Sequence, residues 1–386
     1  MDEVAIVSMA RTAVGRFGGA LRGEEPVELA AKVVRDVIAR AGLEPEQVDR
    51  VVFGENIQMN RGGNPARRIS IAAKLPDEVD AYTINMNCAS GLRAIAAAAQ
   101  DVMLGEADLI VAGGVETMSR TPYILEDARY GYRLGNGVLA DFLADHILGD
   151  AGPMAEKVAR TYGIGREEQD AFALESQRRA VAAIDAGRFA PDIMPVEVHE
   201  RKERRVFDVD EHPRRDTSAE SLARLRPVFQ ADGTVTAGNA SGINDGAAAM
   251  VVTSLAEANR RGLRPLAVVR SWASAGVAPD MFGIGPVPAT RKLLKKTGLS
   301  LGDMELVEIN EAFASSTIAV MRDLELDPGR VNVNGGAIAL GHPVGATGVI
   351  LVIKLVRELL RRGGHRGLVT MCIGSGQGMS MLLETA

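Results

Sequence analysis

The sequence predicts an α/β protein made of two similar halves in which sheets and helices form layers. Apolar strand-like runs alternate with helical patterns over residues 1–118, and such alternation favours largely parallel strands. The last third of the chain repeats the order of a strand, an apolar helix and a strand. Its predicted helix, "ATGVILVIKLVRELLRR" (346–362), is apolar nearly all round, which is typical of an interior helix. We therefore expect two central helices buried between two sheets.

The first half contains the first of these central helices. Its predicted strands are "EVAIVSM" (3–9), "RVVFGEN" (50–56), "AYTINMN" (81–87) and "DLIVAGG" (108–114), and its predicted helices cover residues 26–41, 64–74 and 91–104. In the last of these helices, apolar residues recur at helical spacing and most other positions are alanine. Another helix or sheet can therefore approach it closely.

Residues 119–243 are richer in charge and turns than the flanking halves, with one clear helix predicted around 166–187. This excursion is too long for a simple loop. The last third then supplies predicted strands from "RVNVNGG" (330–336) and "RGLVTMCIG" (366–374), on either side of its apolar helix. That order matches the central part of the first half, so we interpret the chain as a duplicated unit.

Composition narrows the class of protein. The formal net charge of −6 gives no reason to expect nucleic acid or an anionic membrane as a partner. The longest strongly apolar run, "GVILVIKLV" (348–356), is far shorter than the roughly 20 residues of a membrane helix. Two cysteines in 386 residues cannot form a disulfide framework, and the acidic start does not read as a secretory signal. We expect a cytoplasmic protein.

Cys88 lies where a strand-like run gives way to a helix, in "INMNCASGLRAI" (84–95). A buried cysteine is more often a small apolar residue than a nucleophile. Ser90, however, is a good N-cap, which places Cys88 just before the amino end of the helix. Backbone N–H groups and the helix dipole there favour thiolate and can hold an oxyanion. Cys88 is therefore a candidate nucleophile, and it needs a base.

The candidate base is His342, in the glycine-dense turn "NGGAIALGHPVGATG" (334–348). A histidine in a turn is usually structural, but this turn occupies the position in the second unit that Cys88 occupies in the first. If the two units pack about a pseudo-twofold axis, both helix starts converge on one site. The other four histidines stand in polar contexts that predict exposure: His146, His199, His212 and His365.

Three further residues have both a structural and a functional interpretation. Cys372, at the end of a strand in "VTMCIGSGQG" (369–378), is a core cysteine or a second acid/base. Asn310, in "VEINEAFASS" (307–316), is a helix cap or a polar group of the site, and Glu311 beside it is core or supports the site.

The sequence resembles the thiolases of the acetyl-CoA acetyltransferase and acyltransferase family from end to end. All seven motifs of the resemblance occur in order, with both cysteines in family positions, which makes the match highly specific. The motifs are "RTAVGRFGGAL" (11–21), "NMNCASGLRA" (85–94), "GGVETMS" (113–119), "TAGNASGINDGAAA" (236–249), "NEAFA" (310–314), "NVNGGAIALGHPVGATG" (332–348) and "CIGSGQG" (372–378).

The resemblance implies a five-layered α/β/α/β/α thiolase fold and a role for each candidate. Cys88 would take up the acyl group as a thioester, and His342 would accept its proton. Cys372 would move the proton at the α-carbon of acetyl-CoA. Asn310 with His342 would hold a water that stabilises the enolate oxygen. The backbone N–H groups of Cys88 and Gly374 would form a second oxyanion hole.

The resemblance also implies a division of the chain into three parts. The N-terminal half would comprise residues 1–118 and 244–265, the C-terminal half residues 266–386, and a loop domain over 119–243 would cover coenzyme A. In the family positions that contact coenzyme A, Ser241 would meet the pantetheine arm, and Arg214 and Ser221 the nucleotide. Arginine suits that place because it pairs with phosphate and stacks on adenine.

The expected reaction is a reversible ping-pong acyl transfer between acyl-CoA and acetyl-CoA, which places the protein in fatty acid metabolism and β-oxidation. Coenzyme A is then a substrate, and neither a metal nor a redox cofactor is expected because two thiols and a stabilised enolate meet the needs of Claisen chemistry. A homodimer or homotetramer is a family implication.

Departures from the family pattern leave the acyl chain length, its branching and the physiological direction open. The stretch from Ala151 to Met154 stands in place of a usual Met-Gly-x-Thr, after Asp150. Ser375 replaces a usual glycine, Ala13 a usual proline, and Ser316 a common glutamine.

Two alternatives have different signatures. A decarboxylating ketoacyl synthase of the same superfamily pairs its nucleophile with two histidines, or with histidine and asparagine, and lacks the second cysteine. A catalytically silent acyl-CoA-binding protein is expected to lose one of the four candidate groups. This chain keeps Cys88, Asn310, His342 and Cys372, which favours the thiolase interpretation.

Overall fold

A computed structural model of the chain describes residues 3–58, 62–200 and 203–386. Its main strands follow one hydrogen-bonded path in the order β13-β14-β15-β12-β1-β11-β5-β3-β4. The N-terminal half of this path contains β1 (Val4–Thr12), β3 (Arg50–Gly54), β4 (Asp80–Ile84), β5 (Leu109–Thr117) and β11 (Asn244–Ser254). The C-terminal half contains β12 (Ala267–Gly276), β13 (Leu306–Ile309), β14 (Arg366–Ile373) and β15 (Gln377–Thr385).

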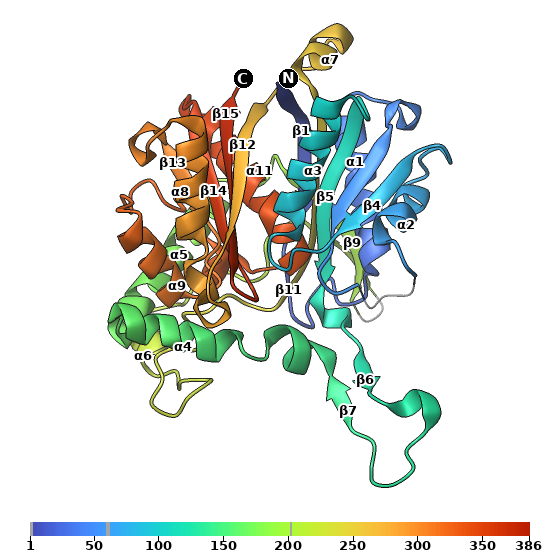
Figure 1. Ribbon diagram of the computed structural model, residues 1–386. Helices are drawn as coiled ribbons and strands as arrows, with labels where there is room; N and C mark the ends of the chain where they lie inside the picture. The colour runs from blue at the N-terminus through green and yellow to red at the C-terminus, as the bar shows by residue number, and fades with distance from the viewer. Residues whose placement is uncertain (1–2, 59–61, 201–202) are drawn as a thin grey trace.

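The path folds into two facing sheets. β1 and β12 pair through Val4, Ala5 and Ile6, and the sheets separate beyond that contact (Figure 1). β3 is parallel to β4 and β5, and β13 is parallel to β14, but the other neighbours in the path are antiparallel. The prediction of largely parallel strands over residues 1–118 is confirmed for the pairs that β3 makes with β4 and β5, whereas β1 pairs antiparallel with β11 and β12 from later in the chain. In the C-terminal half, a turn of three residues joins β14 to β15, and a turn this short can join only antiparallel strands.

Two central helices fill the space between the sheets. α3 (Ser90–Leu104) packs on β3 and β5, α11 (Val344–Arg362) packs on β13 and β14, and the two helices pack on each other. On the outer faces, α1 (Pro26–Arg40) and α2 (Pro65–Ala72) cover the N-terminal sheet, and α8 (Pro286–Thr297) covers β12 and β15 (Figure 1). The predicted five layers are confirmed.

The first turns of α3 and α11 meet through backbone atoms. A Cβ atom added at Gly91 would lie 2.6 Å from the carbonyl oxygen of Gly345, closer than real Cβ atoms approach oxygen. A Cβ at Gly114 on β5 would overlap the same oxygen, and one at Gly348 would overlap the backbone of Leu92. Glycine is therefore required on both helices and on the strand beside them.

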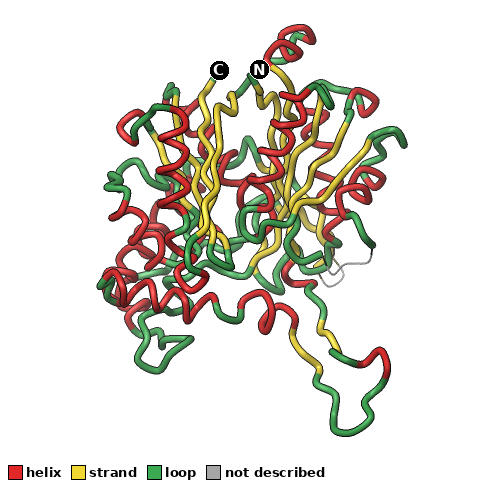
Figure 2. The backbone as a smooth tube through the Cα atoms, in the orientation of Figure 1, coloured by secondary structure: helices red, strands yellow, loops and turns green. Residues whose placement is uncertain are grey.

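The middle of the chain lies across one end of the two sheets (Figure 2). α4 (Ala151–Tyr162) and α5 (Arg166–Asp185) pack on α9 (Ala314–Asp323), and α5 also contacts α6 (Ala219–Ala223). β6 (Tyr123–Leu125) and β7 (Leu139–Asp141) pair to form an arm that projects from the body (Figure 1). The predicted helix around 166–187 is confirmed as α5, whereas α4 was not predicted.

Shorter elements complete the described chain. They are β2 (Gly15–Arg16), β8 (Ile193–Met194), β9 (Val196–Glu200), β10 (Glu203–Phe207), α7 (Leu255–Arg261), α10 (Ala337–Leu340), the 3₁₀ turns η1 (Pro45–Gln47), η2 (Met118–Arg120), η3 (Ala128–Tyr130), η5 (Pro279–Ile284) and η6 (Leu301–Asp303), and the π turn η4 (Leu143–Leu148). Within the described ranges, no helix is both long and apolar enough to cross a membrane.

The strand predicted over 330–336 is wrong. Val331 makes an isolated bridge with Val307, and Asn332 then turns into the left-handed region with φ of 43°. The side chain of Asn332 replaces the backbone of a neighbouring strand. It accepts a hydrogen bond from the N–H of Ile309 at 2.8 Å and donates one to the carbonyl of Ile309 at 2.9 Å. A side chain can thus imitate strand pairing where the backbone turns away.

The contact between the helix tips predicts that Gly91→Ala destabilises the protein by about 1–3 kcal/mol, the usual cost of overpacking a close-packed interior. Gly23→Ala is the matched control, because Gly23 is exposed and a Cβ there meets no atom within 4 Å. Urea unfolding followed by circular dichroism measures both variants. Equal stability of the two would contradict the close approach.

Candidate active site

Cys88 lies in a tight turn between β4 and α3. The prediction that Ser90 caps the helix is wrong, because α3 begins at Ser90 and Ala89 takes the N-cap position. The hydroxyl of Ser90 instead donates to the carbonyl of Asn87 at 2.6 Å and accepts from the N–H of Met86 at 2.9 Å. Asn87 has a φ of 47°, and its side chain donates to the carbonyl of Gly374 at 3.0 Å. The turn that presents Cys88 is therefore tied to the loop after Cys372.

Burial raises the pKa of Cys88, so the resting residue is a thiol. The backbone N–H groups of Gly374 and of Cys88 itself lower this pKa, and the charge of Glu116 raises it further. The N–H groups act in the predicted direction, toward thiolate, but the loss of water around the sulfur outweighs them. The same two N–H groups lie at the sulfur, where the resemblance implies an oxyanion hole.

His342 is held in one tautomer and in one orientation. Its backbone N–H donates to Oδ1 of Asn244 at 2.9 Å. Its Nδ1 lies 2.7 Å from Oγ1 of Thr347, whose own proton goes to the carbonyl of Pro343. The hydroxyl can then only accept, so Nδ1 carries the hydrogen and Nε2 carries the lone pair. Burial lowers the pKa of His342 to about 4, which leaves a neutral imidazole that can act as a base.

Asn310 and Cys372 approach the same place from neighbouring parallel strands. Asn310 follows β13, donates its backbone N–H to Thr370 of β14, and places Nδ2 3.4 Å from Nε2 of His342. Within the described chain, Oδ1 of Asn310 is buried without a hydrogen-bond partner. Cys372, 2% exposed, is the last but one residue of β14 and precedes Gly374 by two residues. Burial raises the pKa of Cys372, and the charge of Cys88 raises it further.

The structure therefore brings together the five residues that the resemblance assigns to catalysis. Two apolar clusters link them further. Cys88 packs against a cluster that contains Ile57 and Val344, and Val344 follows His342 by two residues. Cys372 packs with Ala312, which follows Asn310 by two residues. These contacts link both thiols, the imidazole, the amide of Asn310 and the N–H groups of Cys88 and Gly374.

Aromatic and small side chains surround Cys372. Phe282 belongs to the same apolar cluster, and Ala151, Met154 and Phe313 pack against that cluster. Phe313 also meets the ring of Phe282 edge to face, with centroids 6.4 Å apart. The altered stretch from Ala151 to Met154 consequently forms part of the wall around the second thiol.

Two of the three residues expected to bind coenzyme A line one cavity. Arg214 and Ser221 line one cavity of about 150 Å³, together with His212. Ser221 shares a reciprocal hydrogen-bonded cap with Ser218 at the start of α6. Ser241 lies outside the lining of that cavity. Its N–H donates to the carbonyl of Ala312 at 2.9 Å, which places Ser241 on the side of the cavity toward Cys372.

His212 corrects the expectation that all histidines other than His342 are exposed. Its ring packs against Gly242, and burial lowers its pKa to about 4 with help from the charges of Arg214 and Arg16. His146, His199 and His365 are exposed as predicted. The polar stretch around residue 212 gave no signal of burial, because its neighbours in sequence are charged.

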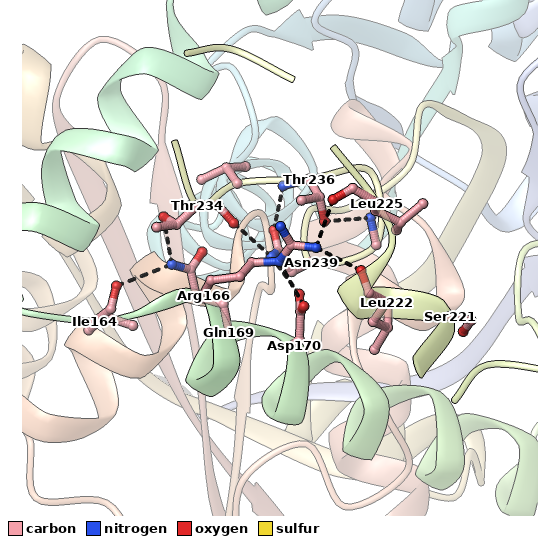
Figure 3. A network of polar contacts seen from close by, with 12 residues as sticks. Ile164, Arg166, Gln169, Asp170, Ser221, Leu222, Leu225, Thr234, Thr236 and Asn239 are labelled. Carbon is pink, nitrogen blue, oxygen red and sulfur yellow. Dashed lines mark hydrogen bonds and ion pairs between the residues drawn. The ribbon is translucent and has the colours of Figure 1, made fainter. Parts of the chain in front are cut away.

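A network of polar contacts holds the elements that line this cavity (Figure 3). Arg166 pairs with Asp170 on the same helix and donates to the carbonyls of Leu222 and Leu225, which fixes α6 against α5. Asp170 also accepts from the side chain of Asn239 at 2.9 Å. Since Asn239 precedes Ser241 by two residues and Ser221 lies on α6, the network supports the segments that carry Ser241 and Ser221.

Sequence reasoning missed Thr347 and Asn244, which hold His342. Both stand inside motifs of the resemblance, so a signal was present, but only the fold shows which side chain each one meets. The fold and the site together define an enzyme class in which thiols carry acyl groups as thioesters.

Comparison with known proteins identifies the family. The family model "Thiolase, N-terminal domain" matches residues 4–256, and "Thiolase, C-terminal domain" matches residues 263–385. An acetyl-CoA acetyltransferase of Pseudomonas aeruginosa is 50% identical over 99% of both chains. A solved Bacillus anthracis acetyl-CoA acetyltransferase superposes with a TM-score of 0.97 at 45% identity, covering 100% of this chain and 99% of the other. A solved human mitochondrial 3-ketoacyl-CoA thiolase superposes with a TM-score of 0.95 at 41% identity, with the same coverage of both chains. The chain belongs to the thiolase family of acyltransferase enzymes.

The bond between His342 and Thr347 predicts that Thr347→Val lowers kcat by about tenfold to a hundredfold, since small losses of orientation have effects of that size. Valine keeps the shape of threonine but cannot accept the proton on Nδ1. The KM for coenzyme A should stay near its wild-type value, as measured by steady-state cleavage of a 3-ketoacyl-CoA. Thr347→Ser keeps the hydroxyl and should retain most activity; an equal loss in both variants would assign the effect to packing.

Proposed function

We propose that this thiolase cleaves 3-ketoacyl-CoA with coenzyme A, and runs the reverse condensation, by a ping-pong mechanism with Cys88 as the nucleophile. The convergence of Cys88, His342, Cys372, Asn310 and the N–H of Gly374 is the one observation that supports this most strongly. The names of its relatives, acetyl-CoA acetyltransferase and 3-ketoacyl-CoA thiolase, support the choice of substrates.

In the first half-reaction, the thiol of Cys88 gives its proton to Nε2 of His342 as its sulfur bonds to the 3-keto carbon. The N–H groups of Cys88 and Gly374 receive the negative charge on the former carbonyl oxygen. The bond between the 3-carbon and the α-carbon then breaks. This leaves an acyl thioester on Cys88 and the enolate of acetyl-CoA.

The enolate takes a proton from Cys372 and leaves as acetyl-CoA. Its oxygen would be stabilised through Asn310 and His342, acting by way of a water as the resemblance implies; the buried Oδ1 and the nearby Nδ2 of Asn310 suit such a contact. In the second half-reaction, coenzyme A gives its thiol proton to the Cys372 thiolate. The coenzyme A sulfur attacks the acyl carbon, and acyl-CoA leaves as the proton returns from His342 to Cys88.

The cavity lined by Arg214 and Ser221 is the proposed site of the nucleotide part of coenzyme A, with the pantetheine arm passing Ser241 toward Cys88. An arginine suits a phosphate-bearing ligand. Coenzyme A enters as a substrate, and the two thiols, the imidazole and the backbone N–H groups supply the chemistry, so we propose no further cofactor. Both free thiols need a reducing compartment, which supports the cytoplasm and β-oxidation as the setting.

We also propose that the enzyme is a homotetramer in which the β6–β7 arms of the copies pack together. The arm carries large exposed apolar side chains, at Tyr123, Leu125, Tyr130, Leu134, Val138 and Leu139. Such a patch marks an interface, since soluble monomers rarely expose one. The edge strand β4 offers a second contact, by pairing with its copy.

Light scattering after size exclusion tests the assembly. The wild type should elute as four chains, and the double change Tyr130→Ser with Leu134→Ser should release smaller species with unchanged circular dichroism. A tetramer that survives this double change would exclude the arm as the contact.

Two cysteine variants test the proposed reaction. Cys88→Ala should form no acyl-enzyme when incubated with acetyl-CoA, whereas Cys372→Ser should acylate at Cys88 but fail to exchange the α-protons of acetyl-CoA. Intact-mass analysis and proton exchange by NMR measure the two outcomes. A persistent adduct in Cys88→Ala would overturn the assignment of the nucleophile. In the same experiments, the rate at which the wild type cleaves 3-ketoacyl-CoA substrates of increasing length gives the range of acyl chain lengths that it accepts.

A further inference from the structure

The motif "GGVETMS" (113–119) has a feature that the acyl transfer described above does not use. Its Glu116 lies on β5, 1% exposed, and faces the space between the two halves. A buried carboxylate is costly unless it is paired or well hydrogen-bonded. In the described part of the chain, its hydrogen bonds come from three backbone N–H groups.

These three bonds join the two halves of the molecule. Oε2 accepts from the N–H of Asn56 at 3.1 Å and from the N–H of Gly345 at 2.9 Å, and Oε1 accepts from the N–H of Ile57 at 3.1 Å. Asn56 and Ile57 follow β3 in the N-terminal half. Gly345 is in the first turn of α11, where backbone N–H groups have no partner within the helix. One side chain thus connects both halves.

Both catalytic helix tips are attached to the residues that Glu116 holds. His342 precedes Gly345 by three residues, in the turn that leads into α11. Ile57 packs in the same apolar cluster as Val344 and Cys88. The Gly345 carbonyl in turn lies against Gly91, in the first turn of the helix that follows Cys88. A shift of Glu116 would therefore move His342 relative to Cys88.

Glu116 also acts on the nucleophile through its charge, which raises the pKa of Cys88. The groups that face Glu116 from the neighbouring elements are Glu55 after β3 and Asp245 on β11, besides Cys88 itself. Burial raises the pKa of Glu116 to about 7 and that of Asp245 to about 6, and burial with the charge of Glu116 raises that of Glu55 to about 9. The charge of an ionised Glu116 thus adds to the effect of burial, which keeps the Cys88 sulfur protonated.

We propose that Glu116 is a positioning residue of the acyl transfer: its carboxylate clamps the first turn of α11 to the segment after β3, and so holds the imidazole of His342 in place beside the Cys88 thiol. The inference rests on the proposed function of Cys88 and His342. It assigns a role to the third motif and concerns a residue that does not touch substrate.

Two variants of Glu116 separate the effect of its side-chain length from the effect of its charge. Glu116→Gln keeps the length of the side chain but lacks the charge and one acceptor oxygen. Glu116→Asp keeps the charge but is one methylene short of the three N–H groups. Both should lower kcat by about tenfold to a hundredfold, the effect of small displacements at a reacting centre, while the KM for coenzyme A changes by less than about twofold. Only Glu116→Gln should move the pH profile of Cys88 alkylation by iodoacetamide, to lower pH.

Glu358→Gln is the matched control. Glu358 is also a buried carboxylate, but it lies on α11 near the C-terminal end of that helix. There it accepts a hydrogen bond from Asn334 and pairs with Arg361 and Arg362. Its loss should lower the melting temperature without changing kcat or the alkylation profile.

The outcomes distinguish this inference from the proposed function. An inactive wild type, or a wild type that forms no adduct at Cys88, would overturn the function itself. An active wild type beside a fully active Glu116→Gln would overturn the positioning role alone. So would a parallel loss of kcat, coenzyme A affinity and melting temperature in both Glu116 variants, because that result describes a fold defect.

Discussion

The backbone contact between the tips of α3 and α11 is the constraint on which the rest of the structure depends. Gly91, Gly114 and Gly345 leave out side chains where two helices and a strand meet, so that the loops in front of both helices reach the same point. Cys88 and His342 occupy those loops. A duplicated fold has two equivalent helix starts, and bringing them together brings the loop of the proposed nucleophile in one half to the loop of the proposed base in the other. Fusion of the halves through β1 and β12 keeps that contact within one chain.

Burial at this junction determines the protonation states. Both thiols have raised pKa values and His342 has a lowered one, each chiefly through loss of water. The resting site therefore carries little charge, apart from the carboxylates behind it. Charge arises only when a substrate carbonyl is attacked, and fixed backbone N–H groups are already in place to receive it. Such preorganised dipoles are effective because they need no rearrangement during the reaction. The buried clamp at Glu116 and the bond from Thr347 to His342 serve the same preorganisation.

Local pattern predicted the helices and most strands of the two halves, because periodicity records which face is buried. It failed where a side chain or a distant segment decides the outcome. Asn332 replaces strand pairing with its own amide, and Pro153 lies in the first turn of α4, where its missing N–H costs no hydrogen bond, so a stretch that looks like a turn begins a helix. Cys88 and His342 stood out through their place in the repeat. The thiol state of Cys88, the burial of His212 and the partners of His342 depend on tertiary packing, which no local pattern contains.

The departures from the family pattern fall outside the contacts that hold the catalytic groups. Ala151 and Met154 belong to the wall around Cys372, and Ser316 packs on Gly283, where a Cβ would already overlap its hydroxyl. A side chain as long as glutamine could not occupy that position without moving η5, which carries Phe282. Ser375 is exposed and has a φ of 69°, a conformation that favours glycine. The core of the two halves therefore holds the proposed catalytic groups, while the inserted middle region and η5 form the apolar wall beside Cys372, where Ala151, Met154 and Ser316 lie.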